Sequence, residues 1–289
     1  MARISIDRVF ERRLAALVNG GEPKILQRGL RGVEKESLRV TPQGQIARTP
    51  QPPGLGSALT SEHVTTDFSE ALIELVTPTF TTSWELLQYL CDLHQFIYRH
   101  LGDELLWATS MPGALEGDRS VPIAQYGSSH IGRMKTIYRE GLGLRYGRVM
   151  QAISGVHFNY SFPQPFWEAF AAITESRETG TQLVSGGYFD LLRSYHRHGW
   201  LILYLFGVSP ALSTSFLAGR DEKLPILTPG TAYEPYATSL RMSDLGYRNR
   251  NQAGLAVSVN SLSEYVRDLA RAIHTPHPPY EAHGVRVDG

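Results

Sequence analysis

The sequence predicts an α+β fold in which a largely antiparallel sheet, flanked by helices, carries a functional site on one face. Residues 30–40 and 72–77 have the side-chain pattern of strands, and Pro78 ends the second of them. Other segments space their apolar residues three and four positions apart, as amphipathic helices do. Strands and helices do not alternate regularly, which disfavours a parallel sheet built from βαβ units.

Helical segments are expected on both sides of these strands. The run that starts near residue 4 ends at Gly20 and Gly21, which stop a helix. Ser261 and Glu264 form a capping box at the start of the last helix. We expect helices over 4–18, 83–101, 164–176, 184–206 and 261–276.

A third strand is expected over residues 149–162, VMQAISGVHFNYSF, from the alternation of its side chains. Gln151, His157 and Asn159 then lie on one side of the strand, and Val156 and Phe158 lie on the other. A lone strand histidine is more often a hydrogen-bonded core or surface residue than a ligand. The acidic strands nearby make His157 a candidate metal ligand.

Composition excludes several classes of protein. Lys plus Arg equals Asp plus Glu at 28 each, so the net charge gives no reason to expect nucleic acid or an anionic membrane as a partner. Cys91 is the single cysteine, which excludes an internal disulfide and favours a reducing compartment. Residues 1–21 lack the apolar core of a signal peptide. We therefore expect a cytoplasmic protein.

One uncharged run, residues 199–219, is long enough to cross a bilayer. Its strongly apolar part, residues 200–208, is too short to do so, and Pro210 interrupts the remainder. We expect a buried helix that leads into a loop.

The strand GLRGVEKESLRV, residues 29–40, carries two carboxylates, Glu34 and Glu36. Residues two apart in a strand share a face, so these side chains project together, about 6.5 to 7 Å apart along the strand. Such a pair can belong to the solvated face of an edge strand. Alternatively, it can bind a cation that neutralises the two like charges.

A second acidic segment, TTDFSEALIELVTP, favours the cation. It places Asp67, Glu70 and Glu74 among apolar residues of high burial tendency. Removing unpaired carboxylates from water costs several kcal/mol each, so a group of them in apolar strands indicates a metal site.

Five segments together resemble the proteobacterial type of glutamate–cysteine ligase. They are GLRGVEKESLRV, ALTSEHVTTDFSEALIELVTP, AQYGSSHIGRMKTIYREGL, SGVHFNYSFP and PYATSLRMSDLGY, and the likeness runs from about residue 22 onward. The resemblance implies a glutamine-synthetase-like catalytic sheet, with residues 1–289 forming a single catalytic domain. It also implies the first step of glutathione biosynthesis, in which the γ-carboxylate of L-glutamate is joined to the amine of L-cysteine through a γ-glutamyl phosphate.

The resemblance also implies roles for individual residues. Arg241 is expected to act in catalysis and to bind the substrate carboxylate or acyl phosphate, for which a planar guanidinium is suited. Tyr138, Gln151 and Tyr247 are expected to line the cysteine pocket. The implied metal is Mg²⁺, or Mn²⁺ in its place, with ATP as co-substrate. The implied metal ligands are Glu34, Glu36, Asp67, Glu74 and His157.

No GxxxxGK[ST] or GxGxxG motif is present, so a nucleotide is expected to be held through metal ions. Two alternatives remain open from the residues alone. One is a carboxylate–amine ligase that uses another amine. The other is a binding module that holds metal and substrate without turnover.

We also expect the chain to be a truncated ligase that does not turn over alone. Residues 285–287, VRV, have the pattern of a strand, and Asp288-Gly289 is typical of a hairpin turn with no returning strand after it. The family that the chain resembles continues beyond this point, and there it supplies a further acidic ligand and a phosphate-facing arginine.

Overall fold

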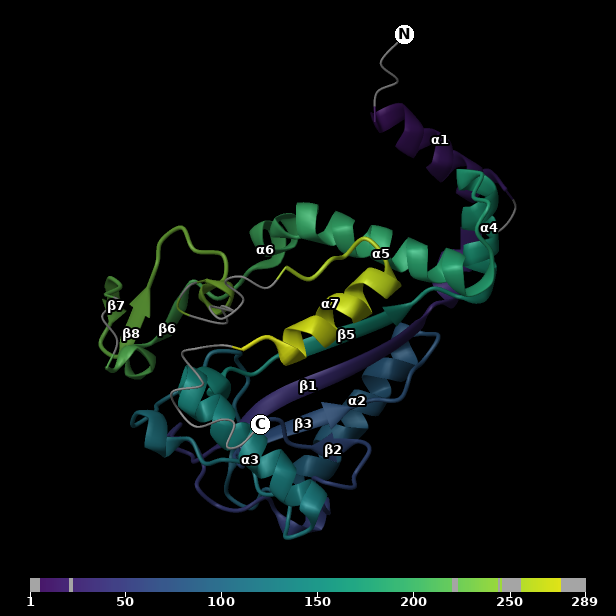
Figure 1. The fold of residues 1–289 in the computed structure, drawn as a ribbon. Helices are drawn as coiled ribbons and strands as arrows, with labels where there is room; N and C mark the ends of the chain where they lie inside the picture. The colour runs from purple at the N-terminus through teal and green to yellow at the C-terminus, as the bar shows by residue number, and fades with distance from the viewer. Residues whose placement is uncertain (1–5, 21–22, 220–222, 244, 246–255, 277–289) are drawn as a thin grey trace. The chain divides into compact units, whose positions relative to one another are not determined.

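The computed structural model describes residues 6–20, 23–219, 223–243, 245 and 256–276 (Figure 1). The chain divides into two compact units. The sheet unit comprises Val18–Phe166 and Phe206–Arg248, and the helical unit comprises Met1–Leu17, Trp167–Leu205 and Asn249–Gly289. The single catalytic domain expected from the sequence stays a prediction. The expected strand over 285–287 and the turn after it lie outside the described residues.

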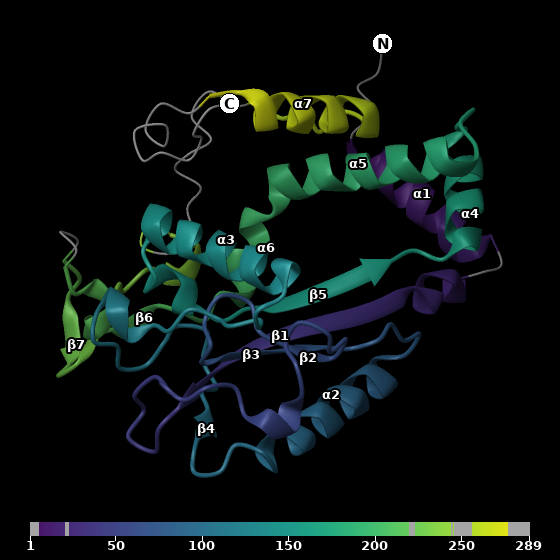
Figure 2. The same cartoon turned by 60° about the horizontal axis from the view of Figure 1, so that its bottom comes forward.

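The sheet unit is built on one long strand, β1 (Leu30–Val40), which lies between its neighbours in Figures 1 and 2. β3 (Leu72–Val76) and β5 (Val156–Ser161) both pair with β1 in the antiparallel sense. The short β4 (Leu105–Leu106) pairs with the far end of β1, and β2 (Val64–Thr65) pairs with β3. The predicted α+β fold with an antiparallel sheet is therefore confirmed.

The two faces of β3 point into different surroundings. Ile73 and Leu75 pack in a cluster with Ile97 of α2 (Ser83–Tyr98), which lies along one face of the sheet. Leu72 faces the other way and joins Leu38 of β1 in the larger core. Glu74 is two residues from Leu72 and shares its face.

Arg39, near the end of β1, is fully buried. Its guanidinium donates to the Glu104 carboxylate at 2.6 Å and to the carbonyls of Thr49 and Glu70 at 2.8 and 2.9 Å. Three loop segments that are distant in the sequence therefore converge on this end of β1. Burying this charge is tolerable because it is both paired and hydrogen-bonded.

Five α-helices of the described residues belong wholly or mostly to the helical unit. Their bounds are α1 (Ile6–Asn19), α4 (Gln164–Thr174), α5 (Gly180–His198), α6 (Trp200–Phe206) and α7 (Leu262–His274). The predicted cap of α7 is confirmed, because the Ser261 hydroxyl accepts from the Glu264 amide at 3.2 Å. α5 and α7 pack together through Phe189 and Tyr265, whose ring centroids lie 5.9 Å apart.

Three sequence expectations need correction. The strand predicted over 149–162 is shorter, because residues 150–152 form a 3-10 turn and β5 begins only at Val156. The helix predicted over 184–206 is broken at Gly199 into α5 and α6. α6 is exposed rather than buried, with Trp200 at 64% and Phe206 at 73%. None of the described helices is long and apolar enough to cross a membrane.

Two further features were not predicted. α3 (His130–Tyr146) contains Gly132, Gly141 and Gly143 and has a weak apolar stripe, so its sequence gives little helical signal. A small three-stranded sheet contains β6 (Ala211–Ser213), β7 (Ile226–Thr228) and β8 (Thr231–Tyr233).

The exposed edge of β5 generates the first prediction. Among the described residues β5 pairs only with β1, and its apolar side chains Val156 and Phe158 are 63% and 61% exposed. An apolar edge strand favours pairing with a second chain. We expect the protein to self-associate with rising concentration and Phe158→Lys to shift it toward monomer in sedimentation velocity. Leu144→Lys is the matched control, because Leu144 is 89% exposed but lies on α3. Equal effects of the two substitutions would contradict the role of the edge.

Candidate functional site

The register of the sheet brings the acidic residues of different strands together. Glu36 of β1 lies directly opposite Glu74 of β3. Glu34 of β1 lies directly opposite His157 of β5. Directly opposed residues in an antiparallel pair have Cβ atoms about 5 Å apart, so their side chains interact strongly.

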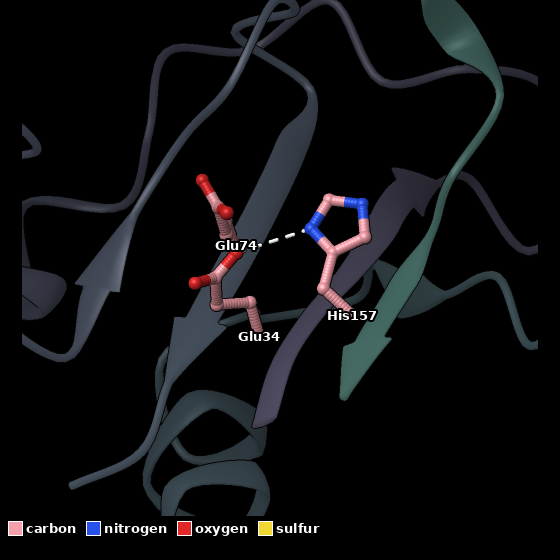
Figure 3. A group of neighbouring side chains, drawn as sticks. All are labelled: Glu34, Glu74 and His157. Carbon is pink, nitrogen blue, oxygen red and sulfur yellow. Dashed lines mark hydrogen bonds and ion pairs between the residues drawn. The ribbon is translucent and has the colours of Figure 1, made fainter. Parts of the chain in front are cut away.

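Glu34, Glu74 and His157 form a tight cluster on one face of the sheet (Figure 3). Each offers one ligand atom, and these atoms all lie within 4.8 Å of one another. The Nδ1 atom of His157 lies 3.1 Å from a carboxylate oxygen of Glu34. Figure 3 shows the three side chains turned toward one another from three different strands. The structure therefore brings together three of the five predicted metal ligands.

Glu36 lies beside this cluster, and we call Glu34, Glu36 and Glu74 together the acidic patch. The carboxylate of Glu36 also binds the backbone. The Gly155 N–H donates to Glu36 Oε2 at 2.6 Å, and the Glu36 N–H donates to the Gly155 carbonyl at 2.9 Å. The Gly155 N–H therefore bonds to the Glu36 side chain instead of to the backbone of β1, and the pairing of β1 with β5 does not extend to Gly155. The predicted role of Glu36 as a ligand stays a prediction.

Asp67 lies beside the cluster rather than in it. It sits in the bend between β2 and β3, not in a strand, and its carboxylate is 3.7 Å from the Arg139 guanidinium. Its negative charge still reaches the cluster, because it helps to raise the pKa values of Glu36 and Glu74. Its predicted role as a ligand stays a prediction.

The electrostatics of the patch are unfavourable for three ionised carboxylates. Burial first, and then the charges of Asp67, Glu36 and Glu34, raise the pKa of Glu74 to about 7. Burial also raises the pKa of Glu36, and the hydrogen bond from Gly155 opposes this increase. A cation bound here would reverse the balance by stabilising the ionised forms.

Arg241 lies close to the same patch. Its Nη1 atom donates to the Ser110 hydroxyl at 3.1 Å and to the Ser154 carbonyl at 2.8 Å. A methyl group at Gly155 would lie 3.0 Å from Arg241 Nη2 and 3.2 Å from His157 Nε2. Gly155 therefore lies against both the guanidinium and the imidazole, and its lack of a side chain permits their close approach.

The predicted cysteine-pocket residues are less clearly placed. Tyr138 is on α3 and 59% exposed, whereas Gln151 is buried in the 3-10 turn before β5. Tyr247 lies outside the described residues. The cysteine pocket stays a prediction.

Sequence reasoning missed two residues of the site. Asn159 Nδ2 donates to Glu34 Oε1 at 3.1 Å and so orients the carboxylate of a candidate ligand. Its position two residues after His157 on β5 was the available signal. Gly155 is the second residue that sequence reasoning missed, because no local sequence pattern indicated a role for it.

The donor set fits a hard divalent cation. Two carboxylates and one imidazole, from three strands, match the ligands that Mg²⁺ and Mn²⁺ take in proteins. Together with the nearby Arg241, the site could hold a cation and an anionic group side by side.

Comparison with known proteins gives a consistent result. A family model described as glutamate-cysteine ligase matches residues 14–289. A glutamate–cysteine ligase of Alcanivorax borkumensis is 51% identical over 96% of this chain and 53% of its own length. One from Pseudomonas putida is 47% identical over 97% of this chain and 53% of its own length. The chain spans about half the length of the curated relatives it matches.

Solved structures show the same likeness. The crystal structure of a glutamate–cysteine ligase from Francisella tularensis, in complex with AMP, matches with a TM-score of 0.81 and 38% identity. The match covers 90% of this chain and 51% of that one. A bifunctional glutathione synthetase from Pasteurella multocida matches with a TM-score of 0.74 and 26% identity, over 92% of this chain and 33% of that one.

The clustered carboxylates generate a prediction about metal and stability. Glu74→Gln removes one charge from the patch, so we expect an equal or higher melting temperature in chelator and a loss of the stabilisation by Mg²⁺. Glu36→Gln should also lose Mg²⁺ stabilisation, with a smaller gain in chelator, because Gly155 already stabilises the Glu36 carboxylate. Thermal denaturation with and without Mg²⁺ measures both. Full Mg²⁺ stabilisation in both variants would contradict the metal site.

The raised pKa of Glu74 predicts a pH dependence in chelator. Between the ordinary value of 4.5 and about 7, the folded chain holds a proton at Glu74 that the unfolded chain has released. Stability should therefore fall as the pH rises through this window. Melting temperatures at pH 5 and pH 8 should show a smaller fall for Glu74→Gln than for the unmodified chain. Equal falls would mean that another group is responsible.

Proposed function

Because the chain belongs to the glutamate–cysteine ligase family, we propose that it provides the metal-binding sheet of an enzyme that joins L-glutamate to L-cysteine with ATP. The convergence of Glu34, Glu74 and His157 on one face of the sheet carries this proposal. The AMP complex of the Francisella tularensis relative supports the use of a nucleotide. The single cysteine, Cys91, is in keeping with a cytoplasmic location.

The chemistry explains why such a site is needed. Forming an amide from a carboxylate is unfavourable in water, so ATP first converts the glutamate γ-carboxylate into an acyl phosphate. A bound Mg²⁺, or Mn²⁺, would supply positive charge to the phosphate oxygens during this transfer. The amine of cysteine then attacks the acyl carbon, and phosphate leaves.

In this proposal the residues of the chain have distinct tasks. Glu34, Glu74 and His157 would hold the cation, and Asn159 would orient Glu34. Glu36 would complete the acidic patch from its anchor on Gly155. Arg241 would bind the substrate carboxylate or the acyl phosphate, because its planar fork can donate two parallel hydrogen bonds.

The test of the function is ATP consumption with L-glutamate, with and without L-cysteine. Release of ADP that depends on cysteine, with formation of γ-glutamylcysteine, supports the proposal. ADP release with a different one of the twenty amino acids would identify another carboxylate–amine ligase. Binding of Mg²⁺ and glutamate by calorimetry without ADP release is expected of residues 1–289 alone, but in a chain as long as the curated relatives it would identify a binding module. We expect no turnover by residues 1–289 alone, and a rate of about 1 s⁻¹ or more would overturn that expectation.

Arg241→Lys tests the substrate contact. Lysine keeps the charge but loses the planar fork, so we expect at least tenfold weaker glutamate binding, or an equivalent loss of kcat/KM in an active preparation. Arg145→Lys is a matched control, because Arg145 lies in the last turn of α3 and has no proposed role. Unchanged glutamate affinity in Arg241→Lys would mean that Arg241 has only a structural role.

A further inference from the structure

We infer that Ser110 is a positioning residue that holds Arg241 against the carboxylate–histidine cluster. The inference rests on the proposed function, in which Arg241 binds the glutamate carboxylate or the acyl phosphate. Ser110 opens the loop SMPGALEGDRS, which follows β4 and carries none of the predicted site residues.

Ser110 and Ser154 are joined by two hydrogen bonds. The Ser154 N–H donates to the Ser110 carbonyl at 2.9 Å, and the Ser110 hydroxyl donates to the Ser154 carbonyl at 2.6 Å. The loop is therefore fastened to the segment that leads into β5. Because the single hydroxyl proton of Ser110 is used in this way, its lone pairs remain for an incoming donor.

Arg241 supplies that donor. One nitrogen, Nη1, contacts both the Ser110 hydroxyl at 3.1 Å and the Ser154 carbonyl at 2.8 Å. Two acceptors on one nitrogen fix both the position and the plane of the guanidinium. Loss of the Ser110 hydroxyl would remove one of these two restraints on the plane.

The next residue links this arrangement to the metal ligands. Gly155 donates to Glu36 at 2.6 Å, and a methyl group on it would meet Arg241 Nη2 at 3.0 Å and His157 Nε2 at 3.2 Å. The backbone of Ser154 and Gly155 therefore sets the spacing between Arg241 and the acidic patch. The Ser110 hydroxyl keeps the guanidinium at that spacing.

An Arg241 guanidinium that is oriented before the substrate binds should increase the affinity for L-glutamate. An arginine that is already held in place loses less side-chain freedom when it binds a carboxylate. We therefore expect Ser110→Ala to weaken L-glutamate binding about tenfold, as measured by calorimetry with Mg²⁺ and a non-hydrolysable ATP analogue. Ser110→Thr keeps the hydroxyl and should restore most of the affinity.

A double-mutant cycle separates positioning from general structural damage. In an Arg241→Ala background, Ser110→Ala should have no further effect on glutamate affinity, because the group that it positions is gone. Ser120→Ala is the matched control. The Ser120 hydroxyl donates to the Gly117 carbonyl at 2.6 Å and is outside this network. A full tenfold effect of Ser110→Ala in the Arg241→Ala background, or an equal effect of Ser120→Ala, would overturn the inference.

A readout without ligand distinguishes failure of this inference from failure of the proposed function. In NMR spectra of the arginine side chains, held Nη protons give separate, slowly exchanging signals, whereas a freely rotating guanidinium gives averaged ones. We expect separate Arg241 signals in the unmodified chain and in Ser110→Thr, and faster exchange between these signals in Ser110→Ala. Identical spectra for all three would overturn the positioning role, even if glutamate binds. The expected difference in a chain that binds no glutamate would support the positioning role and count against the proposed function.

Discussion

Repulsion between carboxylates on neighbouring strands is the constraint on which the rest of the site depends. Glu36 and Glu74 stand opposite each other because the apolar residues around them fix the register of β1 and β3. Leu38 pairs with Leu72 on the same face, and Ile73 packs on the α2 side. A slip of one residue would turn the acidic side chains toward α2 and expose the core. Core packing therefore holds the acidic patch together in spite of its charge.

Part of this arrangement could be predicted from the sequence because its signals are local. The strands of Glu34 and Glu74 follow from side-chain alternation over a few residues, and Ser261 marks a helix start by its own hydrogen bond. Other features depend on distant partners. β5 begins at Val156 because Gly155 gives its N–H to Glu36, a residue far away in the sequence. No pattern around residues 149–162 records that contact.

The acidic residues of the segment 65–78 also show that a local pattern cannot predict contacts with distant residues. Asp67, Glu70 and Glu74 looked equivalent in sequence, yet only Glu74 joins Glu34 and His157. Glu70 accepts the backbone N–H groups of Gln51 and Gln125 at 2.9 and 2.8 Å, so its charge holds two loops. Asp67 faces Arg139. The supply of nearby donors, which only the tertiary structure defines, decides what each carboxylate does.

The burial of Arg39 has a consequence for how β1 can move. At that end the strand is held by a charged group that binds three other segments, and Arg39 is fully buried. At the other end Leu30 is 43% exposed. Local opening costs least where a strand has few buried contacts. Any local opening of β1 should therefore start at Leu30 rather than at Arg39, and it must break the pairing of β1 with β3 and β5 before it reaches Glu34. The candidate ligand Glu34 is thus held on a strand that is paired on both sides and anchored beyond it at Arg39.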